Sequence, residues 1–482
     1  MATATERTGP GAEPTGGSGE RRSTARPLVG AVLALTILGF ALASYRLGTK
    51  SLWLDEAVSA NHARLGLSGL WTVITSHDPN MGLYYVLLHF WTRVFGDSEA
   101  AVRSMTVVLA GFAVPVMYLL GRRLFGRSAG IYAALLLAVA PFFVQYEQTA
   151  RSYALVVVLV LLSSYFFVAE LEKPSRATLI AYVLASVLAV YAHYFGALVL
   201  VVQALTLIAV RRRGAVTVAY RPPWRSWCCA FRRRCSRTAP ARRTSPGFTL
   251  PASARCFTCR RISRAAGCWL CCSRCWPATD SRGRSPIGQG WQAGFVAAWL
   301  VVPVVLVFAV SRLGRPLFVA YYLIVVLPAF VLLASAGLAK LPRREASWAA
   351  AAALVVLSAI GVRNWYDRPS LEDYRAATHA VLASERPSDG VVYYPAGTLR
   401  GPNSGFAYYE ARAGVRGPAP LAFGFTTGPQ PRPPRVWLVT RRSDTTAHVQ
   451  RKLQQTLGRD YRQAVPPAGF RNVTVTLYRR GG

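Results

Sequence analysis

The sequence predicts an all-α polytopic membrane protein with a small α/β domain at its C-terminal end. Of the 482 residues, 52% are hydrophobic. They gather into runs of about 18–20 residues, the length that a helix needs to cross a bilayer. After residue 362 the runs stop, and polar sequence with Pro- and Gly-rich joints follows. Most of the core is therefore expected inside lipid, with a soluble domain behind it.

Nine apolar runs qualify as membrane spans. They lie at 27–45, 101–121, 128–145, 152–169, 177–195, 196–210, 292–310, 317–338 and 346–362. The preceding residues 1–26 are polar and rich in Gly, Thr and Glu, which is typical of a disordered tail. Arg21, Arg22 and Arg26 place this tail in the cytoplasm, because cytoplasmic loops collect Lys and Arg. The first run is longer than a typical signal-peptide core, so we expect a retained anchor.

The segment 218–285 differs from the rest of the chain. Residues 211–284 hold eighteen Arg, no Lys, no Glu and a single acidic residue, and all nine Cys lie between Cys228 and Cys275. Three explanations remain open: a zinc site or disulfides built from the Cys-x-x-Cys pairs, a basic disordered loop, or translation out of frame. The abrupt edges and the missing acidic residues favour the last, which leaves this segment unstructured. Two spans would then be lost, and about eleven would be intended.

The formal charge of +35 does not indicate nucleic-acid binding, because about half of it comes from that one segment. Elsewhere the basic residues define topology. Arg122, Arg123 and Arg127 mark an inside loop, so the loop that holds Asp55 lies outside. Only an odd number of spans fits between them. The stretch 81–95 is therefore expected as a short amphipathic helix along the outer surface rather than as a span.

These boundaries divide the chain into a cytoplasmic tail and four further parts. They are an N-terminal membrane module (27–217), the anomalous segment (218–285), C-terminal membrane helices (286–362) and an extracytoplasmic domain (363–482). In the last part, strand-like runs at 391–394, 436–439 and 473–478 accompany a helical stretch at 372–383. The domain is therefore predicted to be of the α/β type.

The expected outer loops concentrate the polar residues that could carry chemistry. Asp55 and Glu56 are adjacent carboxylates at a membrane surface, where they suit proton abstraction or cation binding. Candidate substrate-binding residues are His77, Asp78, Glu147, Gln148, Arg151, Tyr153, His193, Arg315 and Tyr322. A carboxylate base beside arginines suits transfer from a phosphate-linked donor, because the base deprotonates an acceptor hydroxyl while Arg neutralises the departing phosphate.

Each candidate also has a purely structural interpretation. The acidic pair could belong to an ordinary solvated loop after a membrane span. His193 could be a packed interfacial residue, and Arg315 could cap the end of a helix. Glu147 and Arg151, four positions apart at a helix start, could pair with each other.

The chain resembles the polyprenyl-phosphate-sugar-dependent glycosyltransferases of the GT-C class. The similar segments are SLWLDEA, DPNMGLYYVLLHFW followed by FGDSEAAVR, GRRLFGRSAG and QYEQTARSYAL. More narrowly, these segments resemble the bacterial relatives of dolichyl-phosphate-mannose protein mannosyltransferases, that is, glycosyltransferase family 39. The resemblance covers residues 28–210 and, less closely, 291–375 with its EDYRAA segment.

The resemblance implies an enzyme of the cell membrane with its active site on the extracytoplasmic face. It would move a mannose-like hexose or a pentose, with inversion, from a polyprenyl phosphate to a glycan, lipid or protein. Asp55 is implied as the general base, and Glu56 as a neighbour that orients it or substitutes for it. Glu147 and Arg151 are implied to line the second loop, and Arg315 to face the lipid phosphate.

Two positions depart from the family pattern. The family usually has His-Pro-Pro before Leu-Tyr-Tyr, where this chain has Asp78-Pro79-Asn80. Its late Arg-Tyr motif is replaced by Tyr321-Tyr322. These changes leave Arg315 as the main cation expected at the phosphate.

Two other functions remain open, namely a transporter or flippase of lipid-linked sugars and an inactive product of a frameshifted gene. Transporters place ionisable groups near the bilayer midplane and often show internal repeats. Here the charges cluster at one membrane face and no repeat is visible, which favours the enzyme. The residues identify no cofactor, and a divalent cation at the carboxylate pair is left open. The expected partners are the polyprenyl-phosphate sugar donor, a cell-envelope acceptor and membrane lipid.

Overall fold

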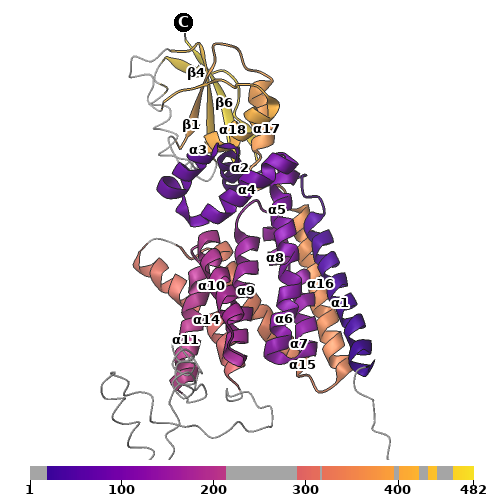
Figure 1. Ribbon diagram of the computed structural model, residues 1–482. Coiled ribbons are helices and arrows are strands. Elements are labelled where there is room, and N and C mark those ends of the chain that lie inside the picture. Colours follow the sequence, from indigo (N-terminus) through magenta and orange to yellow (C-terminus); the bar gives the residue numbers. More distant parts are fainter. Residues whose placement is uncertain are drawn as a thin grey trace, which may run out of the picture. The chain divides into compact units, whose positions relative to one another are not determined.

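The computed structural model (Figure 1) describes residues 19–212, 290–314, 317–395, 401–422, 432–441, 457 and 460–481. The anomalous segment 218–285 and residues 1–18 of the tail lie outside this part. The described membrane region is helical. Its elements are α1 (Gly19–Ser44), α5 (Glu99–Gly111), α6 (Ala113–Phe125), α7 (Arg127–Ala138), α8 (Pro141–Glu147), α9 (Tyr153–Glu172), α10 (Arg176–Ala192), α11 (Gly196–Arg212), α14 (Trp291–Leu313), η4 (Ala320–Val326), α15 (Leu327–Ala339) and α16 (Arg344–Asp367).

The predicted polytopic fold is confirmed, and all nine predicted runs form helices. Within the described residues, six helices are long and apolar enough to cross a membrane, and α7 with α8 makes a seventh span bent by 56°. This criterion gives fewer spans than the nine expected, because it leaves out α10 and α11, which are apolar but shorter. At about 1.5 Å per residue, 17 residues reach about 26 Å, less than the roughly 30 Å of a typical hydrocarbon core.

Two predicted boundaries shift. Helix α1 begins at Gly19, inside the stretch expected to be disordered, because Glu20 and the arginines that follow it favour helix formation. Helix α16 continues to Asp367, past the expected end of the membrane region at 362.

The two ends of the helices carry the loops that the charge pattern assigned to opposite faces. At one end, Arg123 Nε donates to Glu172 Oε2 at 2.6 Å and joins α6 to α9. At the other end, Gln148 Nε2 donates to the carbonyl of Ala43 at 3.0 Å, and Trp365 Nε1 donates to Gln148 Oε1 at 2.7 Å. The ends of α1, α8 and α16 are therefore fastened together around one amide side chain.

The first loop outside the bundle is itself helical. It contains α2 (Leu54–Arg64), α3 (Leu67–Thr72), the short turns η1 (Val73–His77) and η2 (Pro79–Met81), and α4 (Gly82–Phe95). As predicted for 81–95, α4 is amphipathic. It buries Tyr84, Tyr85 and Leu88 and exposes Phe90 and Val94. Helix α4 packs on α2 and thereby supports the segment that carries the acidic pair.

The region after α16 is an α/β unit, as predicted. Its elements are α17 (Tyr374–Leu382), β1 (Gly390–Tyr394), α18 (Pro402–Ala413), β2 (Ala419–Pro420), β3 (Arg435–Arg441), β4 (Tyr461–Gln463), β5 (Ala468–Phe470) and β6 (Val473–Arg480). The described strands form a sheet in the order β2-β1-β3-β6-β4, with β5 also paired to β6. β1 pairs with β3 in parallel, and β3 with β6 antiparallel. Val392, Val436 and Leu438 lie in its core.

This α/β region contacts the first loop directly. The backbone amide of Leu52 donates to Tyr409 Oη at 2.9 Å, and that of Leu54 donates to Glu372 Oε2 at 2.8 Å. Both acceptors come from the C-terminal region, about 320–360 residues later in the chain. The start of α2 is therefore held by the C-terminal α/β region on one side and by the ends of the membrane helices on the other.

Candidate active site

The first turn of α2 carries both acidic residues. Two carboxylates at the N-terminus of a helix are stabilised by its dipole. Glu56 also reaches back to the start of its own helix, where the amide of Trp53 donates to Glu56 Oε2 at 3.3 Å. The side chains of Asp55 and Glu56 point into different surroundings, and this difference suits the two carboxylates to different chemical roles.

Glu56 is buried, with 1% of its surface exposed, and its oxygens are occupied. Arg103 Nε donates to Oε1 at 2.8 Å and Arg103 Nη2 donates to Oε2 at 2.6 Å. The amide of Ala150 adds a third bond, to Oε1 at 2.8 Å. A carboxylate with these donors is poorly suited to accept a proton from a substrate, so Glu56 fastens the first and second loops to α5.

Asp55 has the opposite environment. Its side chain is 17% exposed, and the nearest guanidinium nitrogen in the described structure, Arg151 Nη2, lies 3.9 Å from Oδ2. The backbone around it is fixed, because Ser59 Oγ donates to the carbonyl of Asp55 at 3.0 Å and Arg151 Nη1 does so at 3.4 Å. The geometry therefore presents a positioned carboxylate that still has room for a hydroxyl donor.

Arg151 links Asp55 to a second carboxylate region. It is buried, and its Nη1 also donates to Ser59 Oγ at 3.3 Å. Burial on its own would lower the pKa of Arg151, but the neighbouring Tyr85, Asp55 and Asp78 outweigh it and raise that pKa above its usual range. Asp78 in turn accepts a hydrogen bond from Tyr85 Oη at 2.6 Å. A permanent cation thus lies 3.9 Å from the carboxylate of Asp55 and within electrostatic range of Asp78.

An aromatic wall borders this cluster. Tyr153 lies 5.7 Å from Tyr321 and 6.2 Å from His193 between ring centroids. Tyr322 stacks on Phe195 at 4.7 Å with an interplanar angle of 13°. The structure therefore brings the rings of Tyr153, His193 and Tyr322 together.

His193 is neutral at physiological pH. Burial and then the charge of Arg151 lower the pKa of His193 to about 3. Its Nδ1 accepts from the amide of Phe195 at 3.2 Å, and its Nε2 lies 3.4 Å from Asn80 Nδ2. It thus joins the third loop to the first as a packed side chain and supplies no cation for a phosphate.

The remaining predicted residues have other positions. His77 is exposed, with Nδ1 3.4 Å from the carbonyl of Thr72, and lies apart from the cluster because η1 turns it toward solvent. Glu147 is buried, and no ion pair joins it to Arg151 in the described structure. Gln148 braces the helix ends described above. Arg315 lies outside the described residues.

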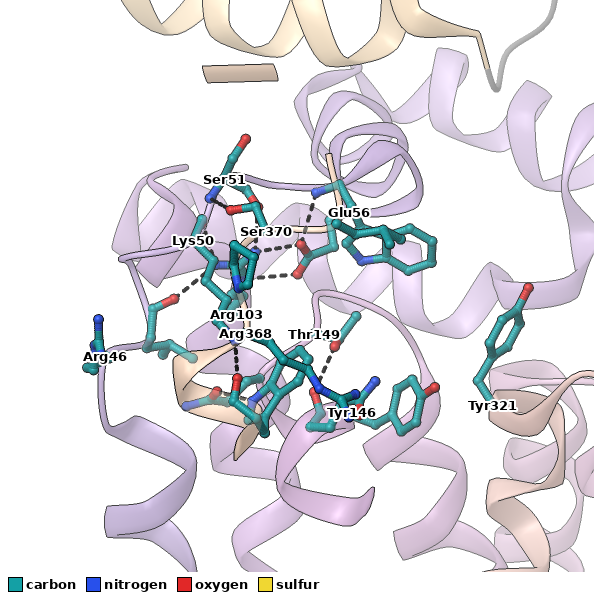
Figure 2. Close-up of a pocket in the computed structure, with 17 residues that line it drawn as sticks. Arg46, Lys50, Ser51, Glu56, Arg103, Tyr146, Thr149, Tyr321, Arg368 and Ser370 are labelled. Atoms are coloured by element: carbon teal, nitrogen blue, oxygen red, sulfur yellow. Dashed lines mark hydrogen bonds and ion pairs between the residues drawn. The ribbon is translucent and has the colours of Figure 1, made fainter. Parts of the chain in front are cut away.

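A cavity of about 270 Å³ opens beside Glu56 (Figure 2). Its lining includes Arg46, Lys50, Ser51, Trp53, Glu56, Arg103, Gln145, Tyr146, Gln148, Thr149, Tyr321, Trp365, Arg368 and Ser370. The sequence prediction missed its cations. Of these cations, Arg103 was the easiest to identify from the sequence, because an ionisable residue near the start of an apolar run is unusual. Lys50 and Arg368 carry no such signal, since each stands in an ordinary polar joint.

Metal binding has no support from the described side chains. No group of three or more His, Cys, Asp or Glu residues among them is placed to hold an ion. The Cys-x-x-Cys pairs lie outside the described part of the chain.

The described residues thus form a membrane helical bundle with a partly exposed carboxylate, Asp55, beyond one of its ends. Residues 78–224 match the sequence profile of the family described as dolichyl-phosphate-mannose-protein mannosyltransferase. No curated protein matches the chain by sequence. The resemblance predicted from the sequence motifs is confirmed over this range.

The fold comparison extends further along the chain. The structure resembles that of ArnT from Cupriavidus metallidurans bound to undecaprenyl phosphate, with a TM-score of 0.52 and 14% identity over 93% of this chain and 98% of that chain. The structure of ArnT from the same organism in the apo state gives a TM-score of 0.49 with 12% identity over 94% and 98% of the two chains. The first of these matches shows that the chain has a GT-C fold, and its apolar helices make it a multi-pass membrane protein.

Proposed function

We propose that the protein is an inverting glycosyltransferase that moves a sugar from a polyprenyl phosphate to an acceptor at the extracytoplasmic face of the cell membrane. The observation that carries this proposal is the contrast between its two adjacent carboxylates. Glu56 is saturated by Arg103, whereas Asp55 is positioned, partly exposed and 3.9 Å from Arg151. The family match over residues 78–224 supports the reaction class.

In the proposed reaction, an Asp55 carboxylate oxygen takes the proton of an acceptor hydroxyl. The acceptor oxygen attacks the anomeric carbon, and the bond from that carbon to the phosphate oxygen breaks on the opposite side. The polyprenyl phosphate leaves with the electron pair. Arg151 holds the loop that carries Asp55 and offers positive charge beside the reacting centre.

An apolar groove supports a lipid-linked donor. It has a volume of about 230 Å³ and is lined by Tyr194, Phe195, Leu198, Leu306, Val307, Val310 and Leu317. These residues come from the loop between α10 and α11, from α11, from α14 and from the segment after α14. At this end of the bundle, Asn80 Oδ1 accepts from the amide of Tyr194 at 3.0 Å. A prenyl tail in this groove would place its phosphate near the aromatic wall.

The proposal is tested with the full chain in membranes and a radiolabelled polyprenyl-phosphate sugar. The unaltered chain should transfer label, and Asp55→Asn should lower the rate about 10²–10⁴-fold, the usual cost of losing a general base. Asp460→Asn is a matched control, because that aspartate is an exposed partner of Arg432 in the C-terminal region. Near-normal transfer by Asp55→Asn would remove Asp55 from the mechanism.

The side of the membrane is tested separately. Cysteine substitutions at Ser76 in the first loop and Ser388 in the C-terminal region, both exposed, should react with an impermeant reagent added from the extracytoplasmic side. Reaction from the cytoplasmic side would contradict the proposed orientation. An unaltered chain without any donor-dependent transfer would favour the inactive product of a frameshifted gene.

A further inference from the structure

The cavity beside Glu56 is rich in cations. Arg46, Lys50, Arg103 and Arg368 all line it, from the end of α1, the following loop, α5 and the residue after α16. Figure 2 shows Arg46, Lys50 and Arg368 on one side of the cavity and Tyr321 on the opposite side. Segments more than 300 residues apart in the sequence thus converge on one small space.

Among the described residues, the positive charges that line this cavity are not balanced by carboxylates. The single acidic residue among those that line it, Glu56, is already paired with Arg103 at 2.6 Å. The contact between Arg46 and Asp367 spans 3.9 Å, with both side chains about half exposed or more. Such an exposed pair is worth little. The described structure pairs neither Lys50 nor Arg368 with a carboxylate, so the cavity carries a net positive charge.

Lys50 is held in place although it has no acidic partner. Its Nζ donates to the carbonyl of Trp365 at 2.6 Å and lies 3.6 Å from the centroid of that indole ring. Burial first, and then Arg103, Arg46 and Arg368, lower the pKa of Lys50 to about 8. Cations fixed at close range without a counterion constitute a site that an anion would stabilise.

The cavity lies away from the apolar groove that suits a prenyl tail. A row of rings connects the two: Phe195 lines the groove and stacks on Tyr322, and Tyr322 lies 4.6 Å from Tyr321, which lines the cavity. Tyr321 also lies within electrostatic range of Asp55 and Arg151. The candidate base therefore lies close enough to Tyr321, at the cavity end of this row, to interact with it electrostatically.

We propose that the cavity lined by Arg46, Lys50 and Arg368 binds an oxyanion, a phosphate or carboxylate, that is carried by the acceptor. This assignment of the acceptor rests on the proposed function, while the anion site itself rests on the cavity alone. The anion would anchor the acceptor on the α1 and α16 side, and the acceptor hydroxyl would reach Asp55 from there. The substrate class is accordingly an acidic acceptor with a hydroxyl within a few bonds of its charge.

The test uses the purified full chain in detergent, with inorganic phosphate and undecaprenyl phosphate as separate probes at constant ionic strength. Phosphorus NMR titration gives the dissociation constant of inorganic phosphate, and tryptophan quenching gives that of undecaprenyl phosphate. The variants are Arg368→Gln and Lys50→Gln. Arg363→Gln is the matched control, because this residue lies on α16 with its side chain 85% exposed and outside the cavity.

Each cavity variant should weaken phosphate binding about tenfold, the size expected for losing one charge-assisted contact, while Arg363→Gln leaves it unchanged. Undecaprenyl phosphate should bind all three variants as it binds the unaltered chain. Phosphate binding that is insensitive to Arg368→Gln and Lys50→Gln would overturn the anion site.

An equal loss of undecaprenyl phosphate binding would show that the donor occupies the cavity, and would overturn the assignment to the acceptor. Neither titration needs turnover. The transfer assay of Asp55→Asn can therefore fail or succeed independently of the anion site.

Discussion

Arg103 donates to both carboxylate oxygens of Glu56, at 2.8 and 2.6 Å, and the two side chains are only 5% and 1% exposed. This buried pair ties α5 to the first turn of α2. Arg103 also donates to the carbonyls of Leu47, Lys50 and Ser51, at 3.0, 2.9 and 3.2 Å. One guanidinium thus fixes the loop before the acidic pair and the helix that carries it.

Glu56→Gln should therefore lower stability more than it alters chemistry. The amide removes the charge that compensates Arg103, and breaking a buried pair typically costs about 3–5 kcal/mol. Asp55→Asn is the matched substitution one residue earlier, at a partly exposed carboxylate, and should change the melting temperature little. Thermal unfolding of both variants in the same detergent checks this contrast.

Equal melting temperatures for Glu56→Gln and Asp55→Asn would contradict the assigned roles. A double-mutant cycle of Glu56→Gln and Arg103→Gln should show that the two losses of stability are not additive, because each single change leaves its partner's charge unpaired in the buried site. Transfer activity of Glu56→Gln, measured below its unfolding temperature, should exceed that of Asp55→Asn.

Much of the fold could be predicted from the sequence, because membrane helices and sheet strands have local patterns of apolar residues. The apolar run at 152–169 became α9, and the alternation at 473–478 became β6. The sequence did not predict the early end of α10. The predicted run extends to residue 195, whereas the helix ends at Ala192 with His193 as its C-cap. Hydropathy alone does not mark that end.

The candidate site was predictable only in part. Asp55, Arg151 and His193 stand in expected outer loops, and their loops do meet. The division of labour between Asp55 and Glu56 was not predictable, because it depends on which carboxylate faces Arg103. The cationic cavity was also not predicted, because it forms only where the ends of α1 and α16 pack together and bring Arg46 near Arg368. At this contact, Tyr366 Oη donates to the carbonyl of Leu42 at 2.6 Å.

The anion affinity of the cavity should fall as the pH rises through about 8. Burial, and then Arg103, Arg46 and Arg368, lower the pKa of Lys50 from 10.5 to about 8, and Glu56 acts in the opposite sense. Lys50 is therefore charged below pH 8 and neutral above it. Sulfate is the appropriate probe, because it stays a dianion throughout the range of roughly pH 6.5 to 9.5 in which Lys50 changes charge.

Lys50→Arg provides the control for that titration, since a guanidinium keeps its charge throughout this range. Sulfate affinity of the unaltered chain should decline above pH 8, and that of Lys50→Arg should stay level. The same decline in both proteins would show that another group titrates. The stability of the fold should depend on pH in the opposite direction to the anion affinity. The unfolded chain binds the Lys50 proton more tightly than the folded chain does, so the free energy of unfolding should rise between pH 8 and 10.5.

Glu372 should act as a positioning residue for Asp55 from the C-terminal region. It is 2% exposed, accepts from the amide of Leu54 at 2.8 Å, and pairs with Arg441 at 2.9 Å. A carboxylate at this point satisfies the first amide of α2 and stabilises the helix dipole. Glu372→Gln keeps an acceptor oxygen but loses the charge, so the first turn that presents Asp55 should become less well fixed.

The expected result for Glu372→Gln is a fall in the transfer rate of about tenfold, with little change in the KM of the donor, because misplacement of a catalytic group acts mainly on the chemical step. Glu372→Asp should retain more of the rate than Glu372→Gln if the charge matters, whereas a general loss of folding would affect both variants alike. Steady-state kinetics over a range of donor concentrations, together with melting temperatures, distinguish these outcomes. A Glu372→Gln enzyme with an unchanged rate would show that the C-terminal region holds α2 without influencing the base.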